Sequence, residues 1–166
     1  MPFRSILRAW RMKFGAWKCH RRIARALALN RRGEVRPDGL RVTEASMSLR
    51  VQWRARLIHP WDRDLPTGTT ERLLVEQSFA DTEAALHRLF TTLPEIDIIE
   101  LRVLDPVSEQ TIMAGIVRRS DLEAARCFAS VKMRLGESGV DFRLTGSRFS
   151  ALGAHHEQES LSMRIE

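Results

Sequence analysis

Residues 46–58 read SMSLRVQWRARLI, and positions 46–57 alternate strictly between polar and apolar side chains. Such a period of two, carried by β-forming residues, predicts a strand with one face in a core and one face in water. The apolar positions are Met47, Leu49, Val51, Trp53, Ala55 and Leu57. We expect the strand to stop before residues 59–66 (HPWDRDLP), because the two prolines of that segment cannot continue a hydrogen-bonded ladder.

The rest of the chain predicts two helices and several further strands around this one. Leu40 and Val42 are expected to add a short edge strand, and the other elements follow from apolar stripes and alternation. The expected elements are a helix at Thr70–Thr92, strands at Ile96–Leu104 and Thr111–Val117, a helix at Ser120–Gly136 and a strand at Val140–Leu144. A competing interpretation makes Thr69–Phe79 a second hairpin strand and starts the helix at Asp81.

The order of these elements is strand–helix–strand–strand–helix–strand, which predicts an α+β fold of the ferredoxin-like, split βαβ type. Its two helices lie on one face of the sheet and leave the other face open. The predicted strands at Ile96–Leu104 and Thr111–Val117 are apolar on both faces, whereas a strand with one wet face should alternate. We therefore expect a second copy of the chain, or a helix at residues 3–17, to cover part of the open face.

The two predicted helices carry further local signals. The buried stripe of the first consists of Val75, Phe79, Leu86, Leu89 and Phe90. In the second, Ser120 and Glu123 match a capping box, and Gly136 matches the left-handed residue that often ends a helix. Cys127 is expected to pack inward as a small apolar side chain. Cys19 is the only other cysteine, and the absence of paired spacing predicts reduced thiols in the cytoplasm.

Charge is divided unevenly along the chain. Residues 1–33 hold ten Lys and Arg and no Asp or Glu, whereas residues 34–166 hold 17 basic and 21 acidic residues, a net charge of −4. We therefore divide the chain into a basic arm at 1–33, an α+β body at 34–145 and a flexible tail at 146–166. No uncharged apolar run approaches the ~20 residues that a membrane-spanning helix needs.

The basic arm predicts an amphipathic helix. Its apolar stripe consists of Phe3, Ile6, Leu7, Trp10, Phe14 and Trp17. Its cationic face consists of Arg4, Arg8, Arg11, Lys18, Arg22 and Arg25. Such a helix can dock on the body, bind an anionic membrane surface, or bind nucleic-acid phosphates, and its Arg-rich composition also matches a targeting segment. We expect a cytoplasmic protein, with peripheral attachment at the inner face of a membrane as one outcome.

His59, Asp62 and Asp64 form the densest group of titratable residues in the sequence. A histidine with two carboxylates can bind a divalent metal or act in acid–base hydrolysis. Their spacing matches no specific metal motif, and Arg63 between the two carboxylates would repel a cation. The simpler interpretation is that both aspartates form turns beside proline and that Trp61 pins the loop. We therefore predict neither a metal nor a cofactor.

Arg50, Arg54 and Arg56 are expected to project from one face of the central strand. They could grip phosphates across an open sheet, but the face lacks the aromatic side chains with which related sheets stack RNA bases. The simpler interpretation pairs them across the sheet with Glu100 or Asp141, at about 0.2–1 kcal/mol for each pair.

Two smaller groups of charged residues remain. Arg118-Arg119-Ser120 lies where a strand leads into a helix, a position that suits an anion, but no glycine-rich loop accompanies it. His155 and His156 lack a second pair of ligands and are expected to be solvated. The sequence contains no Walker loop, dinucleotide fingerprint, nucleophile elbow, zinc-protease helix or Cys-x-x-Cys motif.

Together these features favour a non-catalytic binding or adaptor protein. Its body is expected to contact a protein partner or a second copy as a homodimer, and its arm to dock on an anionic surface or on the body. The first alternative is a nucleic-acid-binding protein that uses the arm and the three arginines of the central strand. A weaker alternative is a metal-assisted hydrolase at the His59 group. No small-molecule substrate is indicated.

Overall fold

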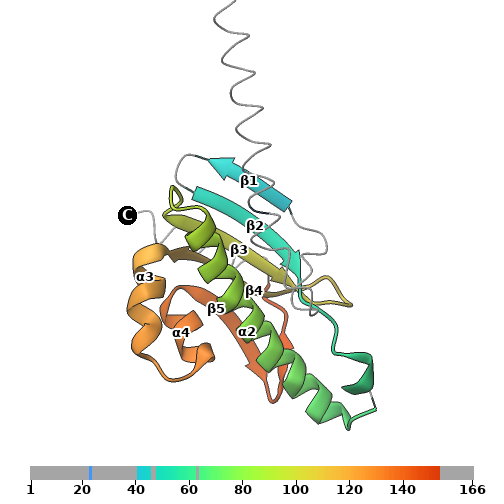
Figure 1. The fold of residues 1–166 in the computed structure, drawn as a ribbon. Coiled ribbons are helices and arrows are strands. Elements are labelled where there is room, and N and C mark those ends of the chain that lie inside the picture. Colours follow the sequence, from blue (N-terminus) through green and yellow to red (C-terminus); the bar gives the residue numbers. More distant parts are fainter. Residues whose placement is uncertain (1–22, 24–40, 46–47, 63, 154–166) are drawn as a thin grey trace, which may run out of the picture.

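The computed structural model describes residues 23, 41–45, 48–62 and 64–153, and they form an α+β fold with a mixed sheet (Figure 1). The strands are β1 (Arg41–Ala45), β2 (Ser48–Arg54), β3 (Ile98–Leu104), β4 (Thr111–Arg118), β5 (Val140–Thr145) and β6 (Arg148–Ser150). The helical elements are η1 (Pro60–Asp62), α2 (Thr67–Thr92), α3 (Arg119–Ala124), η2 (Ala125–Cys127) and α4 (Val131–Glu137). Each expected strand and the long helix are therefore present, with boundaries shifted by a few residues.

The described strands follow one another across the sheet in chain order, β1 to β6. β2 and β3 pair directly and in parallel, and the other neighbouring strands pair antiparallel. A split βαβ unit needs another strand between its two parallel strands, so this sheet differs from the expected ferredoxin-like arrangement. The order of elements along the chain is as expected. That order does not determine which strand edge the β3–β4 hairpin extends, and here β4 pairs with the outer edge of β3 rather than entering between β2 and β3.

The core lies between the sheet and α2, which runs across one sheet face in Figure 1. Alternation along β2 is confirmed, because Leu49, Val51 and Trp53 are buried while Arg50 is exposed. β3 alternates in the same way, and its other face carries half-buried rather than exposed side chains. That a second copy of the chain or a helix at residues 3–17 covers this second face of the sheet stays a prediction.

Helix α2 spans 26 residues and confirms the helical interpretation of this segment, so the competing strand at Thr69–Phe79 is wrong. All five residues of the expected stripe are buried. Phe79 packs edge-on against Phe142 of β5 and Phe149 of β6, with ring centroids 4.8 and 5.4 Å apart. These aromatic contacts join the helix to the last two strands.

The second predicted helix is interrupted and forms α3, η2 and α4. The expected capping box is absent, because the Ser120 hydroxyl bonds the Asp121 carboxylate and does not cap α3, whose N-cap residue is Arg118. Ser130 caps α4 instead, accepting a hydrogen bond from the Met133 amide at 3.2 Å. The sequence pattern of a capping box thus marked the right region but the wrong serine.

Three further expectations for this region need correction. Gly136 lies within α4, and the left-handed residue that follows the helix is Gly139, with φ at 99°. Cys127 is exposed rather than packed inward, because the break after η2 turns it away from the core. The ordered body also continues past residue 145, since β6 pairs with β5 inside the range expected to be a tail.

One residue of the basic arm falls within the described part of the chain. Ile23 is helical, is only 1 % exposed and belongs to the same hydrophobic core cluster as the sheet and α2. The arm is therefore joined to the core at this position. The expected apolar stripe from Phe3 to Trp17, the cationic residues from Arg4 to Arg25, and His155 and His156 all lie outside the described residues.

Candidate functional site

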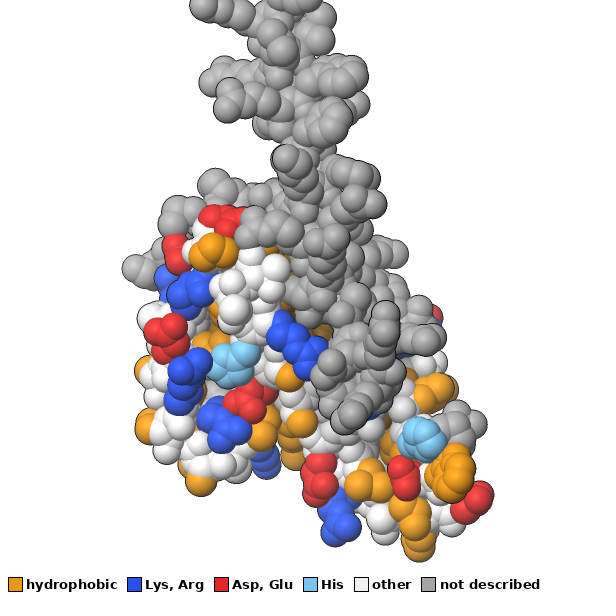
Figure 2. All heavy atoms as spheres, viewed as in Figure 1, with side chains coloured by type: hydrophobic (Ala, Val, Ile, Leu, Met, Phe, Trp, Pro, Cys, Tyr) orange, Lys and Arg blue, Asp and Glu red, His pale blue; other side chains and the backbone are white. Residues whose placement is uncertain are grey.

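The loop between β2 and α2 carries three exposed apolar side chains. Leu57, Trp61 and Leu65 are 56 %, 86 % and 40 % exposed, and we call them the loop patch. In Figure 2, hydrophobic side chains gather at this end of the molecule beside a histidine and acidic groups. The expectation that Trp61 pins the loop by packing is wrong, because almost all of its surface faces solvent. Exposed large apolar residues that cluster are typical of binding surfaces.

The loop has a defined local structure. β2 ends at Arg54, and the prolines that follow prevent continuation of the strand, so Leu57 leaves the alternating pattern and becomes exposed. The short helix η1 forms next, with the Asp62 amide donating to the His59 carbonyl at 2.9 Å. The chain then enters α2 after Pro66, a residue type that suits a helix start.

An ion pair fastens the start of this loop to α2. Arg56 makes two hydrogen bonds to the Asp81 carboxylate, from Nε at 2.7 Å and from a terminal nitrogen at 3.3 Å. Gln77 also donates to the Arg56 carbonyl at 3.2 Å. Two-point arginine–carboxylate pairing fixes geometry as well as charge. Arg56 therefore does not share a phosphate-binding face with the two strand arginines before it.

Those two arginines form cross-sheet ion pairs instead. Arg50 pairs with Glu100 at 2.8 Å, which confirms the simpler of the two interpretations for this residue. Arg54 pairs with Glu109 of the β3–β4 hairpin. Both cations are thus neutralised by carboxylates, which weakens the case for a phosphate-binding sheet face.

His59, Asp62 and Asp64 do not assemble into a metal site. Among the described residues, no group of three or more His, Cys, Asp or Glu side chains lies close enough together to hold a metal ion. His59 instead contributes locally, accepting a long 3.4 Å contact from the Trp61 amide. The role of Asp62 and Asp64 as turn formers stays a prediction, and the hydrolase alternative has no assembled metal site among the described residues.

Arg119 does not offer an anion site at a helix N-terminus. Its guanidinium turns back to the end of α2 and donates to the carbonyls of Phe90, Leu93, Pro94 and Ile96 at 2.5–3.3 Å. The same group lies 4.8 Å from the Phe90 ring centroid and 3.8 Å from the Asp97 carboxylate. A cation at this position satisfies carbonyl groups that a helix end leaves unpaired and complements the helix dipole.

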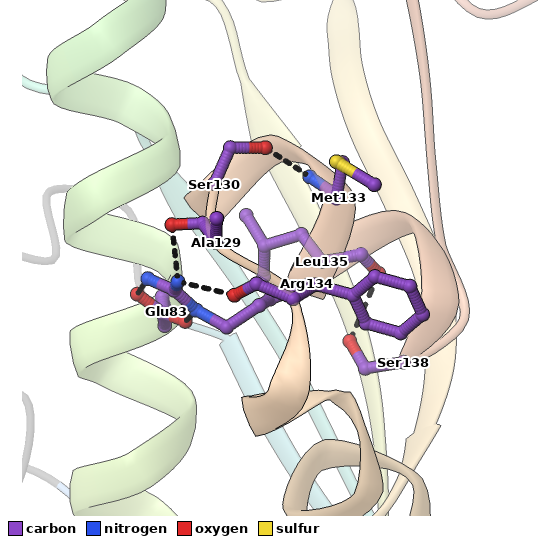
Figure 3. A network of polar contacts seen from close by, with 8 residues as sticks. Glu83, Ala129, Ser130, Met133, Arg134, Leu135 and Ser138 are labelled. Carbon is purple, nitrogen blue, oxygen red and sulfur yellow. Dashed lines mark hydrogen bonds and ion pairs between the residues drawn. The ribbon is translucent and has the colours of Figure 1, made fainter.

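Arg134 makes a second structural clamp, shown in Figure 3. It bonds both oxygens of the Glu83 carboxylate at 2.5 and 3.0 Å and also donates to the carbonyls of Phe128 and Ala129. The hydrogen bond to Glu83 raises the pKa of Arg134 above its usual range, although partial burial opposes this. Arg134 therefore remains a cation throughout the physiological pH range, where its contacts join α4 to α2.

Two hydroxyl groups on the core side of α2 lack hydrogen-bond partners. Ser78 Oγ and Thr82 Oγ1 are fully buried, and neither has a partner within the described part of the protein. We expect Thr82→Val to raise the free energy of unfolding by about 1 kcal/mol, because it removes a buried polar group while preserving shape. Urea denaturation would measure this, with Thr91→Val as the control, since Thr91 is exposed and bonds the His87 carbonyl. A destabilised Thr82→Val variant would contradict the expectation.

The comparisons with known proteins add no assignment to this geometry. Protein families, curated proteins and solved structures all gave no match for this chain. No helix in the described residues has both the length and the apolar character needed to cross a membrane. The loop patch was not predicted from the sequence, because Leu57 belonged to the buried face of a longer expected strand. The prolines at 60 and 66 were the only signal that the chain would leave the sheet there.

Proposed function

We propose that this protein is a non-catalytic binding or adaptor protein whose body contacts a protein partner through the loop patch. The observation that carries the proposal is the exposure of Leu57, Trp61 and Leu65 on one loop. Tryptophan is strongly enriched among residues that dominate binding energy, and burying a large aromatic ring removes much apolar surface from water. Among the described residues, the other exposed large apolar side chains, Val107 and Met133, lie apart in the β3–β4 hairpin and in α4.

The way the loop is held supports this assignment. Arg56 and Gln77 tie its start to α2, and η1 shapes its middle, so the patch is presented by a structured loop. A preorganised surface loses less conformational entropy on binding. The arginines that a nucleic-acid interface would need from the sheet are engaged by carboxylates, which makes that alternative the less supported one. For the basic arm we propose docking on an anionic membrane surface or on a protein body.

A photo-crosslinking amino acid at position 61 tests the proposal in cells that express the full chain. We expect covalent adducts to a protein at position 61, and a loss of at least fivefold in adduct yield when Leu57→Ser and Leu65→Ser are added. Position 107 is the matched control, since Val107 is 79 % exposed but lies in the β3–β4 hairpin. Equal yields at the two positions, or no adduct at 61, would overturn the proposal.

A further inference from the structure

We propose that the loop patch binds residues 1–22 of a second copy of this chain, so that two copies exchange their N-terminal segments. This inference rests on the proposed function and names its partner. It combines the exposed loop patch of the body, the composition of the segment and the position of Ile23.

Two carboxylates lie beside the apolar loop patch in the sequence. Asp62 and Asp64 follow Trp61 in sequence, with Arg63 between them, and within the described residues neither carboxylate forms an ion pair. A ligand for this surface should bring apolar side chains for Trp61 and its neighbours, together with cations for the two carboxylates.

Residues 1–22 have this composition. They hold seven Lys and Arg and no Asp or Glu, and their aromatic residues recur at the three- and four-residue steps of one helix face. Residues 34–166 carry a net charge of −4, so the segment and the body attract each other over distance. Apolar and electrostatic complementarity thus point to the same pair of surfaces.

Ile23 determines where this segment joins its own body. Its burial in the core fixes the end of the segment to its own body, and the apolar stripe from Phe3 to Trp17 lies at least six residues before that anchor. A helix of 22 residues would be about 33 Å long, which is enough to reach across to a neighbouring molecule. Reciprocal exchange buries both apolar surfaces and closes the assembly with twofold symmetry.

A complementation experiment with the full chain tests this exchange. The loop variant carries Leu57→Ser and Trp61→Ala, both at exposed positions, and the segment variant carries Trp10→Ser and Phe14→Ser. Sedimentation velocity should show that the wild-type chain dimerises at micromolar concentration. Each variant alone should have a dimer dissociation constant at least tenfold higher than the wild type. Mixed in equal amounts, the two should recover a heterodimer, because the loop variant still supplies a segment and the segment variant still supplies a loop.

Charge-reversal variants test the same exchange independently of the apolar contacts. Asp62→Lys with Asp64→Lys should weaken the dimer at least tenfold without touching the apolar residues, and added salt should weaken the wild-type dimer. Val107→Ser is the control and should leave the dimer unchanged. A wild-type protein that stays monomeric at 100 µM (about its practical upper limit), or a mixture without recovery, overturns the exchange.

The failure of this inference can be separated from failure of the proposed function. If the wild-type chain is monomeric but position 61 crosslinks to another protein, the loop patch binds a different partner and only the exchange is overturned. If a monomer instead protects Trp61 by binding its own segment, the exchange is likewise overturned. Binding of the wild-type chain to anionic vesicles that is lost in the loop variant would overturn both, since the patch would then be a lipid-binding surface.

Discussion

Gly115→Ala should destabilise the protein by about 3 kcal/mol or more, because β4 and β5 leave no room for a side chain at this position. A Cβ atom on residue 115 would lie 2.1 Å from the Gly139 carbonyl oxygen and 2.9 Å from the Val140 Cα. Both obstacles are backbone atoms, and residue 115 pairs with Val140 in the sheet. Relief of the clash therefore requires the two strands to separate.

Urea denaturation followed by circular dichroism measures this effect. Gly136→Ala is the matched control, because Gly136 lies in α4 and an added Cβ there meets no atom within 4 Å. That substitution should stabilise the protein by about 0.5–1 kcal/mol, through the better helix propensity of alanine. If Gly115→Ala unfolded within 0.5 kcal/mol of the wild type, a close approach of β4 to residue 139 would be contradicted.

Arg119→Ala should also have a large effect and lower the free energy of unfolding by about 2–4 kcal/mol. The substitution leaves the four carbonyl groups at and beyond the end of α2 without their charged donor, and it removes the cation from the face of Phe90. These carbonyls belong to the connection that leads from α2 into β3. We therefore expect hydrogen exchange of the last α2 turn to accelerate as well.

Two further variants make the interpretation of Arg119 specific. Arg119→Lys should recover only part of the loss, because an ammonium group cannot reproduce the planar arrangement of guanidinium donors. Arg126→Ala removes an exposed arginine from the neighbouring η2 and should change stability by less than about 0.5 kcal/mol. Full recovery by lysine would show that charge alone, and not the set of hydrogen bonds, accounts for the effect.

Periodic patterns in the sequence predicted most of the secondary structure. The alternation of Leu49, Val51 and Trp53 identified the buried face of β2, and the stripe of α2 identified its core side. These predictions succeed because burial of every second, or every third and fourth, residue is a local property of the strand or helix. The pairing of Arg50 with Glu100 was also foreseen, since both lie on polar strand faces.

The candidate site was much less predictable. Trp61 was expected to pin its loop, and Arg119 to face an anion, whereas the first is exposed and the second closes a helix end. Neither outcome has a local signal in the sequence. The exposure of Trp61 depends on where the chain leaves the sheet, and the contacts of Arg119 depend on a segment more than 20 residues away in sequence. Only Pro60 and Pro66 hinted at that departure.

The sequence by itself determined which residues of β2 and α2 are buried, and that basic residues concentrate in the first 33 positions. The tertiary structure alone decided the strand order, the partners of Arg56, Arg119 and Arg134, and the exposure of the loop patch. The physical reason is that periodicity records how far each side chain is removed from water. Periodicity carries no information about which distant segment of the chain covers that side chain.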